Sequence, residues 1–186
     1  MRRGTFLALA SLLVAAPAHS LPSRSQAKTY TIRAGAQIVR QIGSFDTRRD
    51  PTIAAATRTF GAPSSRSLRA AYWCRVTWRR LELTIDFMNF GGHGPGETTC
   101  TDTVGKAQSF VVKSRRFRTW KGLRVGVGAD RIQELHPPAE FRQGRWWLRT
   151  AVSPFGDQSE YAVISADVGG RRRVKELDGW IGAAGE

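Results

Sequence analysis

Two adjacent stretches of this chain alternate apolar and polar side chains with a period of two residues. The two apolar rows consist of Tyr72, Cys74, Val76 and Trp78, and of Leu81, Leu83, Ile85 and Phe87. Polar residues such as Arg75, Thr77 and Asp86 lie between them. A period of two is typical of strands with one buried face. The sequence therefore predicts an antiparallel sheet with one apolar face.

Other segments add strands and two short helices to this sheet. Further strands are predicted at 29–33, 108–112, 146–152, 162–168 and 172–177, with positive φ at Gly169 and Gly170 in a hairpin. A helix is predicted over 50–60, with Asp50 as N-cap and Gly61 as a positive-φ C-cap. A shorter helix is predicted at 129–135, before a Pro-Pro pair. The predicted fold class is α+β, dominated by strands.

The order of these elements is similar in the two halves of the chain. Each predicted helix is followed by an aromatic pair, Tyr72-Trp73 or Trp146-Trp147, that opens an alternating strand. We therefore predict two helix-plus-antiparallel-sheet units in tandem, over residues 36–113 and 114–186. The alternative is two unrelated α+β segments that share a common order of elements.

The first residues resemble an export signal. Arg2 and Arg3 precede an apolar run, and Ala16-Pro17-Ala18 has the small-x-small cleavage pattern. We predict a signal peptide over 1–18, an N-terminal arm over 19–35, and a secreted or periplasmic protein; the alternative is a short membrane anchor. No stretch after Ser20 is long and apolar enough for a membrane span, so none is expected in the mature chain.

Cys74 and Cys100 are the two cysteines of the chain. An even pair in an oxidising compartment predicts a disulfide. Paired thiols are not available as nucleophiles or metal ligands, and histidines and carboxylates are too scattered to indicate a zinc site. No metal or cofactor is therefore expected.

A short run in the second half resembles a known extracytoplasmic module. The run comprises Gly122-Leu123-Arg124-Val125-Gly126, Ala129-Asp130-Arg131-Ile132, Leu135 and Pro137-Pro138. It is similar to the β-lactamase-inhibitor-protein-like and SmpA/OmlA-like modules, which place a short helix before three or four antiparallel strands. His136 stands where these modules usually have Gly, and the lipid-bearing Cys is absent. The resemblance implies a non-catalytic, protein-binding module that makes contact through the concave face of its sheet.

Candidate catalytic groups have simpler interpretations. His93 lies in the Gly-rich stretch 91–96, which fits no phosphate-binding pattern and is interpreted as a hairpin connection. Glu82 and Asp86 have the spacing of a carboxylate pair, but a solvated strand face explains them. The nucleophile elbow Gly-x-Ser-x-Gly is missing. The sequence therefore predicts a protein that is not an enzyme, with no catalytic residues.

Basic clusters are the strongest candidate contacts, since the chain has a formal charge of +14. The candidate anion or partner contacts are Lys113, Arg115, Arg116, Arg118, Trp120, Lys121, Arg171, Arg172 and Arg173. Trp73 and Trp147 are the candidate aromatic contacts. An exported chain meets little nucleic acid, so we expect a protein or an anionic cell-envelope polymer as partner. The leading hypothesis is an inhibitor-like binding protein, the second is a polyanion-binding protein, and the third is a secreted hydrolase with His93 as its candidate residue. A merely soluble basic coat is the alternative interpretation of the basic clusters.

Overall fold

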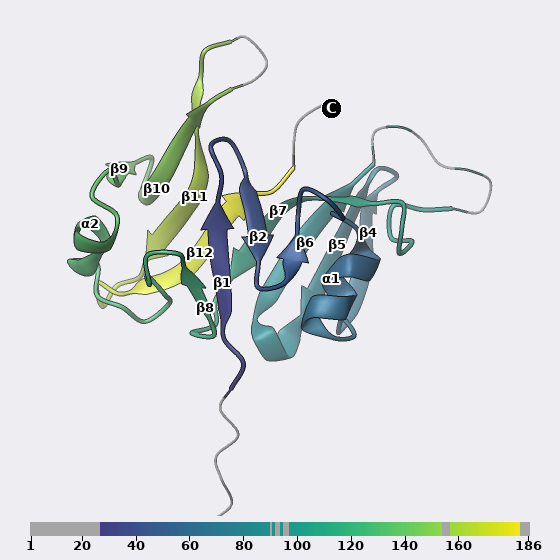
Figure 1. Cartoon of the computed structure of the whole chain (residues 1–186), viewed down its shortest axis with the longest axis horizontal. Coiled ribbons are helices and arrows are strands. Elements are labelled where there is room, and N and C mark those ends of the chain that lie inside the picture. Colours follow the sequence, from purple (N-terminus) through teal and green to yellow (C-terminus); the bar gives the residue numbers. More distant parts are fainter. Residues whose placement is uncertain (1–26, 90, 92–93, 95–96, 154–156, 183–186) are drawn as a thin grey trace, which may run out of the picture.

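The computed structural model describes residues 27–89, 91, 94, 97–153 and 157–182, and these form two sheets and two short α-helices (Figure 1). The elements are β1 (Tyr30–Ala34), β2 (Val39–Ile42), β3 (Phe45–Asp46), α1 (Ile53–Phe60), β4 (Ser65–Ala70), β5 (Trp73–Trp78), η1 (Arg79–Leu81), β6 (Leu83–Met88), β7 (Lys106–Val112), β8 (Phe117–Thr119), α2 (Arg131–Leu135), β9 (Glu140–Arg142), β10 (Arg145–Val152), β11 (Glu160–Val168) and β12 (Val174–Trp180). The strand-dominated α+β class is confirmed. The predicted signal peptide and His93 lie outside the described residues.

One large antiparallel sheet contains eight of the strands. Its order is β4-β5-β6-β7-β12-β11-β10-β9. In each half of the chain a helix precedes four successive strands, α1 before β4–β7 and α2 before β9–β12. Pairing of β7 with β12 joins the two sets edge to edge, so the sheet continues across the predicted boundary at residues 113 and 114.

Cross-strand register gives the large sheet an apolar face and a polar face. One row on the apolar face runs through Trp78, Leu83, Val112, Leu177, Ala166, Trp146 and Phe141. The neighbouring row, on the polar face, runs through Thr77, Thr84, Val111, Asp178, Ser165, Trp147 and Glu140. Successive strand residues point to opposite faces, so the predicted alternation in β5 and β6 is confirmed. Tyr72 departs from it, because it precedes β5 and is exposed.

A small mixed sheet lies beside α1 and has the order β3-β2-β1-β8 (Figure 1). The strand predicted at 29–33 is β1, and it pairs in parallel with β8 from the middle of the chain. An aromatic cluster connects this sheet, α1 and the large sheet: the Tyr30 ring stacks on Phe117 at 4.9 Å, and the Phe60 ring contacts Tyr30 at 5.4 Å and Trp78 at 5.5 Å. The core thus lies between the small sheet, α1 and the apolar face.

The structure corrects the predicted start of α1. Thr52, not Asp50, is the N-cap, and its hydroxyl accepts the Ala55 N–H at 3.2 Å. Asp50 instead accepts the Thr52 hydroxyl proton at 2.6 Å and pairs with Arg58. The predicted C-cap is confirmed, because Gly61 has φ 84° and ends the helix.

Two details of the second half also differ from prediction. The helix α2 spans Arg131–Leu135 rather than 129–135. The positive φ of the β11–β12 hairpin falls on Arg172 (φ 52°), not on Gly169 or Gly170. The Arg172 N–H donates to the Gly169 carbonyl at 2.9 Å and closes the turn. The residue with positive φ is therefore Arg172, two residues after Gly170.

No helix within the described ranges is long and apolar enough to cross a membrane.

Candidate functional site

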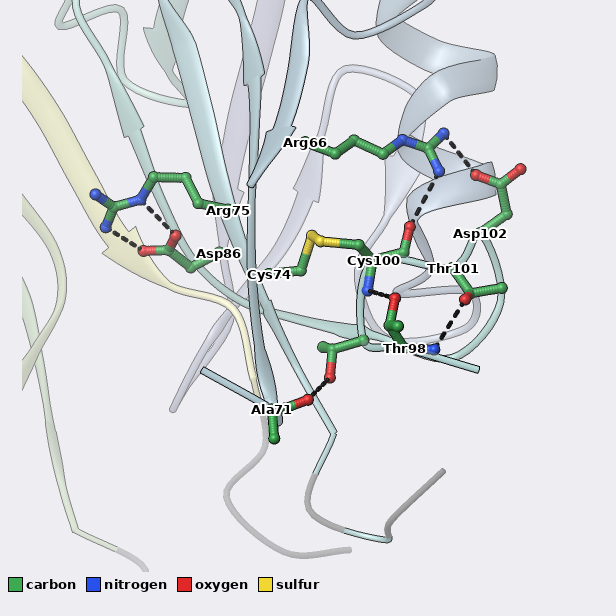
Figure 2. The surroundings of a disulfide bond; sticks show 10 residues. Arg66, Ala71, Cys74, Arg75, Asp86, Thr98, Cys100, Thr101 and Asp102 are labelled. Carbon is green, nitrogen blue, oxygen red and sulfur yellow. Dashed lines mark hydrogen bonds and ion pairs between the residues drawn. A yellow bond between two sulfur atoms is a disulfide. The ribbon is translucent and has the colours of Figure 1, made fainter. Parts of the chain in front are cut away.

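The predicted disulfide joins Cys74 of β5 to Cys100, with the two Cα atoms 5.1 Å apart (Figure 2). Arg66 fixes the far side of this crosslink, because its guanidinium donates to the Cys100 carbonyl at 3.1 Å and pairs with Asp102 at 2.6 Å. The backbone carbonyl of Asp102 in turn accepts a hydrogen bond from the Ala54 N–H at 2.9 Å. The disulfide therefore ties the loop before β7 to β5 and to the first turn of α1.

Backbone pairing of residues 126–129 with residues 172–174 brings two of the basic segments together. The backbone hydrogen bonds are Gly126 N–H to Val174, Val174 N–H to Val127 and Ala129 N–H to Arg172, at 2.7–2.9 Å. These bonds place the start of β12 beside a loop that lies more than 40 residues earlier in the chain.

Two arginines from distant segments meet at Gly126. The Arg173 guanidinium donates to the Gly126 carbonyl at 2.8 Å. Arg115 also approaches this glycine, because a Cβ at position 126 would lie only 2.8 Å from its Nε. Gly126 also has φ 89°, a backbone conformation that favours glycine.

Backbone pairing also brings together a second pair of cations. Arg118 of β8 and Arg124 are partners in an isolated antiparallel bridge. We call the exposed cations of these segments the basic surface: Arg115, Arg116, Arg118, Lys121, Arg124, Arg171 and Arg173. Within the part of the chain that the structure describes, none of them forms an ion pair with a carboxylate.

Three of the predicted contacts do not belong to the basic surface. Lys113 pairs with Glu176 on the polar face at 3.4 Å. Trp120 is half-buried and meets the His136 ring edge-on, with 4.9 Å between the ring centroids. Arg172 lines a separate pocket beside α2.

His136, which stands where the similar modules usually have Gly, is a buried histidine. It is 2% exposed, and its Nε2 lies 2.8 Å from the Thr119 hydroxyl oxygen. Burial, with a smaller contribution from the charge of Lys121, lowers the pKa of His136 from 6.5 to about 4. The imidazole is therefore neutral at physiological pH and serves the core next to the basic surface.

The predicted aromatic contacts lie on the polar face of the large sheet. Trp147 is 7% exposed, and the Arg142 guanidinium lies 5.5 Å from its ring centroid, so little of the ring remains for a partner. Trp73 is half-buried, with Arg75 at 5.6 Å from its ring. The Arg142 guanidinium is itself held by Glu140 and Glu160.

Ion pairs that the sequence analysis missed cross the polar face. Arg75 binds both oxygens of Asp86, at 2.8 and 3.0 Å, on the side of β5 opposite the disulfide (Figure 2). Arg145 and the Ser165 hydroxyl donate to one oxygen of Asp178, at 2.9 and 2.7 Å. The other Asp178 oxygen is buried without a hydrogen-bond partner. Burial raises the pKa of the Asp178 carboxyl.

Glu82 and Asp86, which have the spacing of a carboxylate pair in the sequence, have different surroundings in the structure. Asp86 is engaged by Arg75, whereas Glu82 is an exposed residue at the end of η1 with φ 47°. Among the described residues, no group of three or more His, Cys, Asp or Glu side chains is close enough to hold a metal ion.

Comparisons with protein-family models, with curated proteins and with solved structures find no match to this chain.

Proposed function

We propose that this protein is an exported, non-catalytic binding protein whose ligand is an anionic polymer of the cell envelope, bound by the basic surface. The observation that carries the proposal is the meeting of Arg115 and Arg173 at Gly126. These arginines are far apart in the sequence, and backbone pairing of two loops brings them together. A general basic coat requires no such convergence.

Electrostatics supports a polyanion over a neutral ligand. The chain carries +14, and the basic surface gathers cations that no carboxylate of the described residues neutralises. A surface of one charge sign attracts an oppositely charged polymer over about 8–10 Å at physiological ionic strength. Arginine also binds phosphate or carboxylate groups with two parallel hydrogen bonds. Repeated anionic groups along a polymer therefore match repeated guanidinium groups.

The disulfide and the predicted signal peptide support action outside the cytoplasm. A disulfide persists in an oxidising compartment, and Cys74 and Cys100 are bonded to one another. The anions that such a protein meets are envelope polymers and lipid headgroups rather than cytoplasmic nucleic acid. We take the polymer as the ligand because its repeated charges engage several cations of the basic surface at once.

We also propose that the chain is a tandem of two helix-plus-sheet units, similar to the inhibitor-like and SmpA/OmlA-like modules. The support is the mirrored order of the large sheet, in which the last strands of the two sets, β7 and β12, are neighbours. A continuous sheet is a rigid scaffold, which keeps the binding surface in one arrangement.

A second candidate function is protein binding through the polar face of the large sheet. The observation that favours it is the row of aromatic and ion-paired residues there, with Arg75 held between Trp73 and Asp86. Aromatic and arginine side chains dominate the energy of protein interfaces. Replacing Trp73 and Arg75 by Ala tests this candidate, since it weakens capture of a protein partner and leaves polyanion binding unchanged.

Binding of long-chain polyphosphate and of dextran sulfate, with neutral dextran as reference, tests the first proposal. We expect wild-type protein to bind both polyanions with an affinity that falls steeply with salt. Reversing two exposed charges, Arg115→Glu with Arg118→Glu, should weaken binding about tenfold, because each exposed charge contributes up to about 1 kcal/mol.

Matched variants make this experiment specific. Arg48→Glu with Arg69→Glu changes the net charge by the same amount as the first double variant, at exposed arginines outside the basic surface. It should change the affinity for polyanions less than about twofold, because it alters only the net charge. Arg115→Lys with Arg118→Lys keeps the charge and should retain most of the affinity. Equal losses in the two charge-reversal variants, or binding that is insensitive to salt, would contradict the proposal.

A further inference from the structure

A pocket of about 440 Å³ lies between α2 and the β9–β10–β11 end of the large sheet, apart from the polar face. It is lined by Ala129, Asp130, Gln133, Phe141, Gly144, Trp146, Val168 and Arg172. Its size is within the range of small-molecule sites, about 300–1,000 Å³. Of these residues, Arg172 is a predicted anion or partner contact, and the other seven were not predicted as contacts.

The floor of this pocket is the end of the apolar row of the large sheet. Phe141 and Trp146 are cross-strand partners in that row, and their rings meet edge to face at 5.7 Å. Farther along the row the side chains are buried, but Phe141 is 61% exposed. Covering this exposed aromatic ring with another apolar group would remove its surface from water, which is favourable.

Two opposite charges line the same pocket. Arg172 and Asp130 are both exposed, and neither takes part in an ion pair with another described residue. The Gln133 amide adds a polar group that both donates and accepts hydrogen bonds. The pocket therefore combines an aromatic floor with one cation available to an anionic group.

The backbone conformation of Arg172 determines which substitution can test this cation. Arg172 has φ 52°, in the left-handed region that disfavours side chains other than Gly, Asn and Asp, whereas Gly170 two residues earlier has no positive φ. Glu82, Gln143 and Gln158 have similar positive φ angles, so this conformation is not specific to the pocket. Glycine suits this φ, so Arg172→Gly removes the guanidinium without straining the turn.

We propose that this pocket binds a small ligand with an aromatic body and a single anionic group. The body covers Phe141 and Trp146, and the carboxylate, phosphate or sulfonate group lies against Arg172. Asp130 and Gln133 accept a hydrogen bond from the opposite side of the ligand, and the Asp130 charge disfavours a second anionic group there. The pocket adjoins the basic surface, because Ala129 and Arg172 line it and also form one of the backbone hydrogen bonds between residues 126–129 and 172–174.

A pair of fluorescent probes tests this proposal on the full chain. The first probe, 1-anilinonaphthalene-8-sulfonate, is an aromatic anion, and the second, N-phenyl-1-naphthylamine, is the same molecule without the sulfonate. We expect saturable one-to-one binding of the anionic probe and weaker binding of the neutral probe. Arg172→Gly should weaken binding of the anionic probe about tenfold, as expected for loss of one charge-assisted hydrogen bond, and should change binding of the neutral probe less than twofold.

Two further variants separate the pocket from general apolar and charge effects. Arg171→Gly removes the adjacent charge, does not line the pocket and should leave both probes unaffected. Phe141→Ser removes an exposed ring, so the protein stays folded, and should weaken both probes equally. The proposal is overturned if neither probe saturates, if Arg171→Gly and Arg172→Gly have the same effect, or if Phe141→Ser leaves binding unchanged.

A second copy of this chain is the other occupant to consider. If it covers Phe141, probe binding falls as the protein concentration rises, and sedimentation shows a dimer that Phe141→Ser dissociates. That outcome also overturns the proposal.

Discussion

The buried His136 predicts a stability that depends on pH in a defined window. Its folded pKa is about 4, compared with 6.5 for an unperturbed histidine. The unfolded chain therefore binds more protons between these two values, and the free energy of unfolding falls as the pH falls from 6.5 to 4. At about 1.36 kcal/mol for each pH unit, the loss is about 3 kcal/mol.

Urea unfolding followed by tryptophan fluorescence, at about pH 7.5, 6, 5 and 4, measures this loss. The control is His136→Gln, which does not titrate, so the difference between wild type and variant isolates the histidine. Asp178 works in the opposite direction, because its raised pKa favours the folded state as the pH falls, but it is present in both proteins. A difference that stays constant from pH 7.5 to 4 would refute the reasoning.

Three further predictions concern stability at neutral pH, all measured by urea unfolding. Replacing Cys74 and Cys100 by Ala removes a crosslink between residues 26 apart and should cost about 3.5 kcal/mol, as should reduction of the wild type. Thr52→Ala removes the α1 N-cap and should lower the free energy of unfolding by about 1 kcal/mol. An unchanged free energy of unfolding would show that the Thr52 hydroxyl does not stabilise the helix. Gly179→Ala places a Cβ 2.7 Å from the Val163 carbonyl oxygen and should lower the free energy of unfolding by about 1–3 kcal/mol. Gly170→Ala places a Cβ in open space and should cost less than about 0.5 kcal/mol. Equal costs for the two variants would contradict the close contact at Gly179.

The sequence predicts elements whose pattern is local. Residues 73–78 and 83–88 were recognisable as strands because one face of each is buried by the core, which imposes strict alternation. Gly61 was recognisable as a helix end because positive φ strongly favours glycine. The Cys74–Cys100 bond was predictable from an even count of cysteines and the predicted export signal.

Elements without a local pattern were missed. The edge strand β4 exposes nearly all of its side chains, so no apolar period marks it. The strand β8 is three residues long and depends on parallel pairing with β1, nearly 90 residues earlier. The pairing of β7 with β12 is equally non-local, and no turn signal in the sequence specifies it.

The candidate site was predicted as a list of charges rather than as an arrangement. The clusters around Arg115 and Arg173 were both visible in the sequence, but their meeting at Gly126 depends on hydrogen bonds between residues 126–129 and 172–174. Trp147 was predicted as a contact from its type alone, and its burial under Arg142 follows from its position on the sheet. The pocket beside α2 was missed because Phe141 and Arg172 come from separate strands and turns.

Backbone amide shifts in an NMR titration with polyphosphate test the central proposal most directly, because they locate the ligand on the protein. We predict shifts concentrated in residues 115–118, 121–128 and 171–173, the three segments that form the basic surface. Amides of the polar face, such as those of Arg75, Ser109 and Ser165, should remain unchanged. Shifts that cluster on the polar face, or that spread evenly over exposed cations including Arg48 and Arg69, would contradict it.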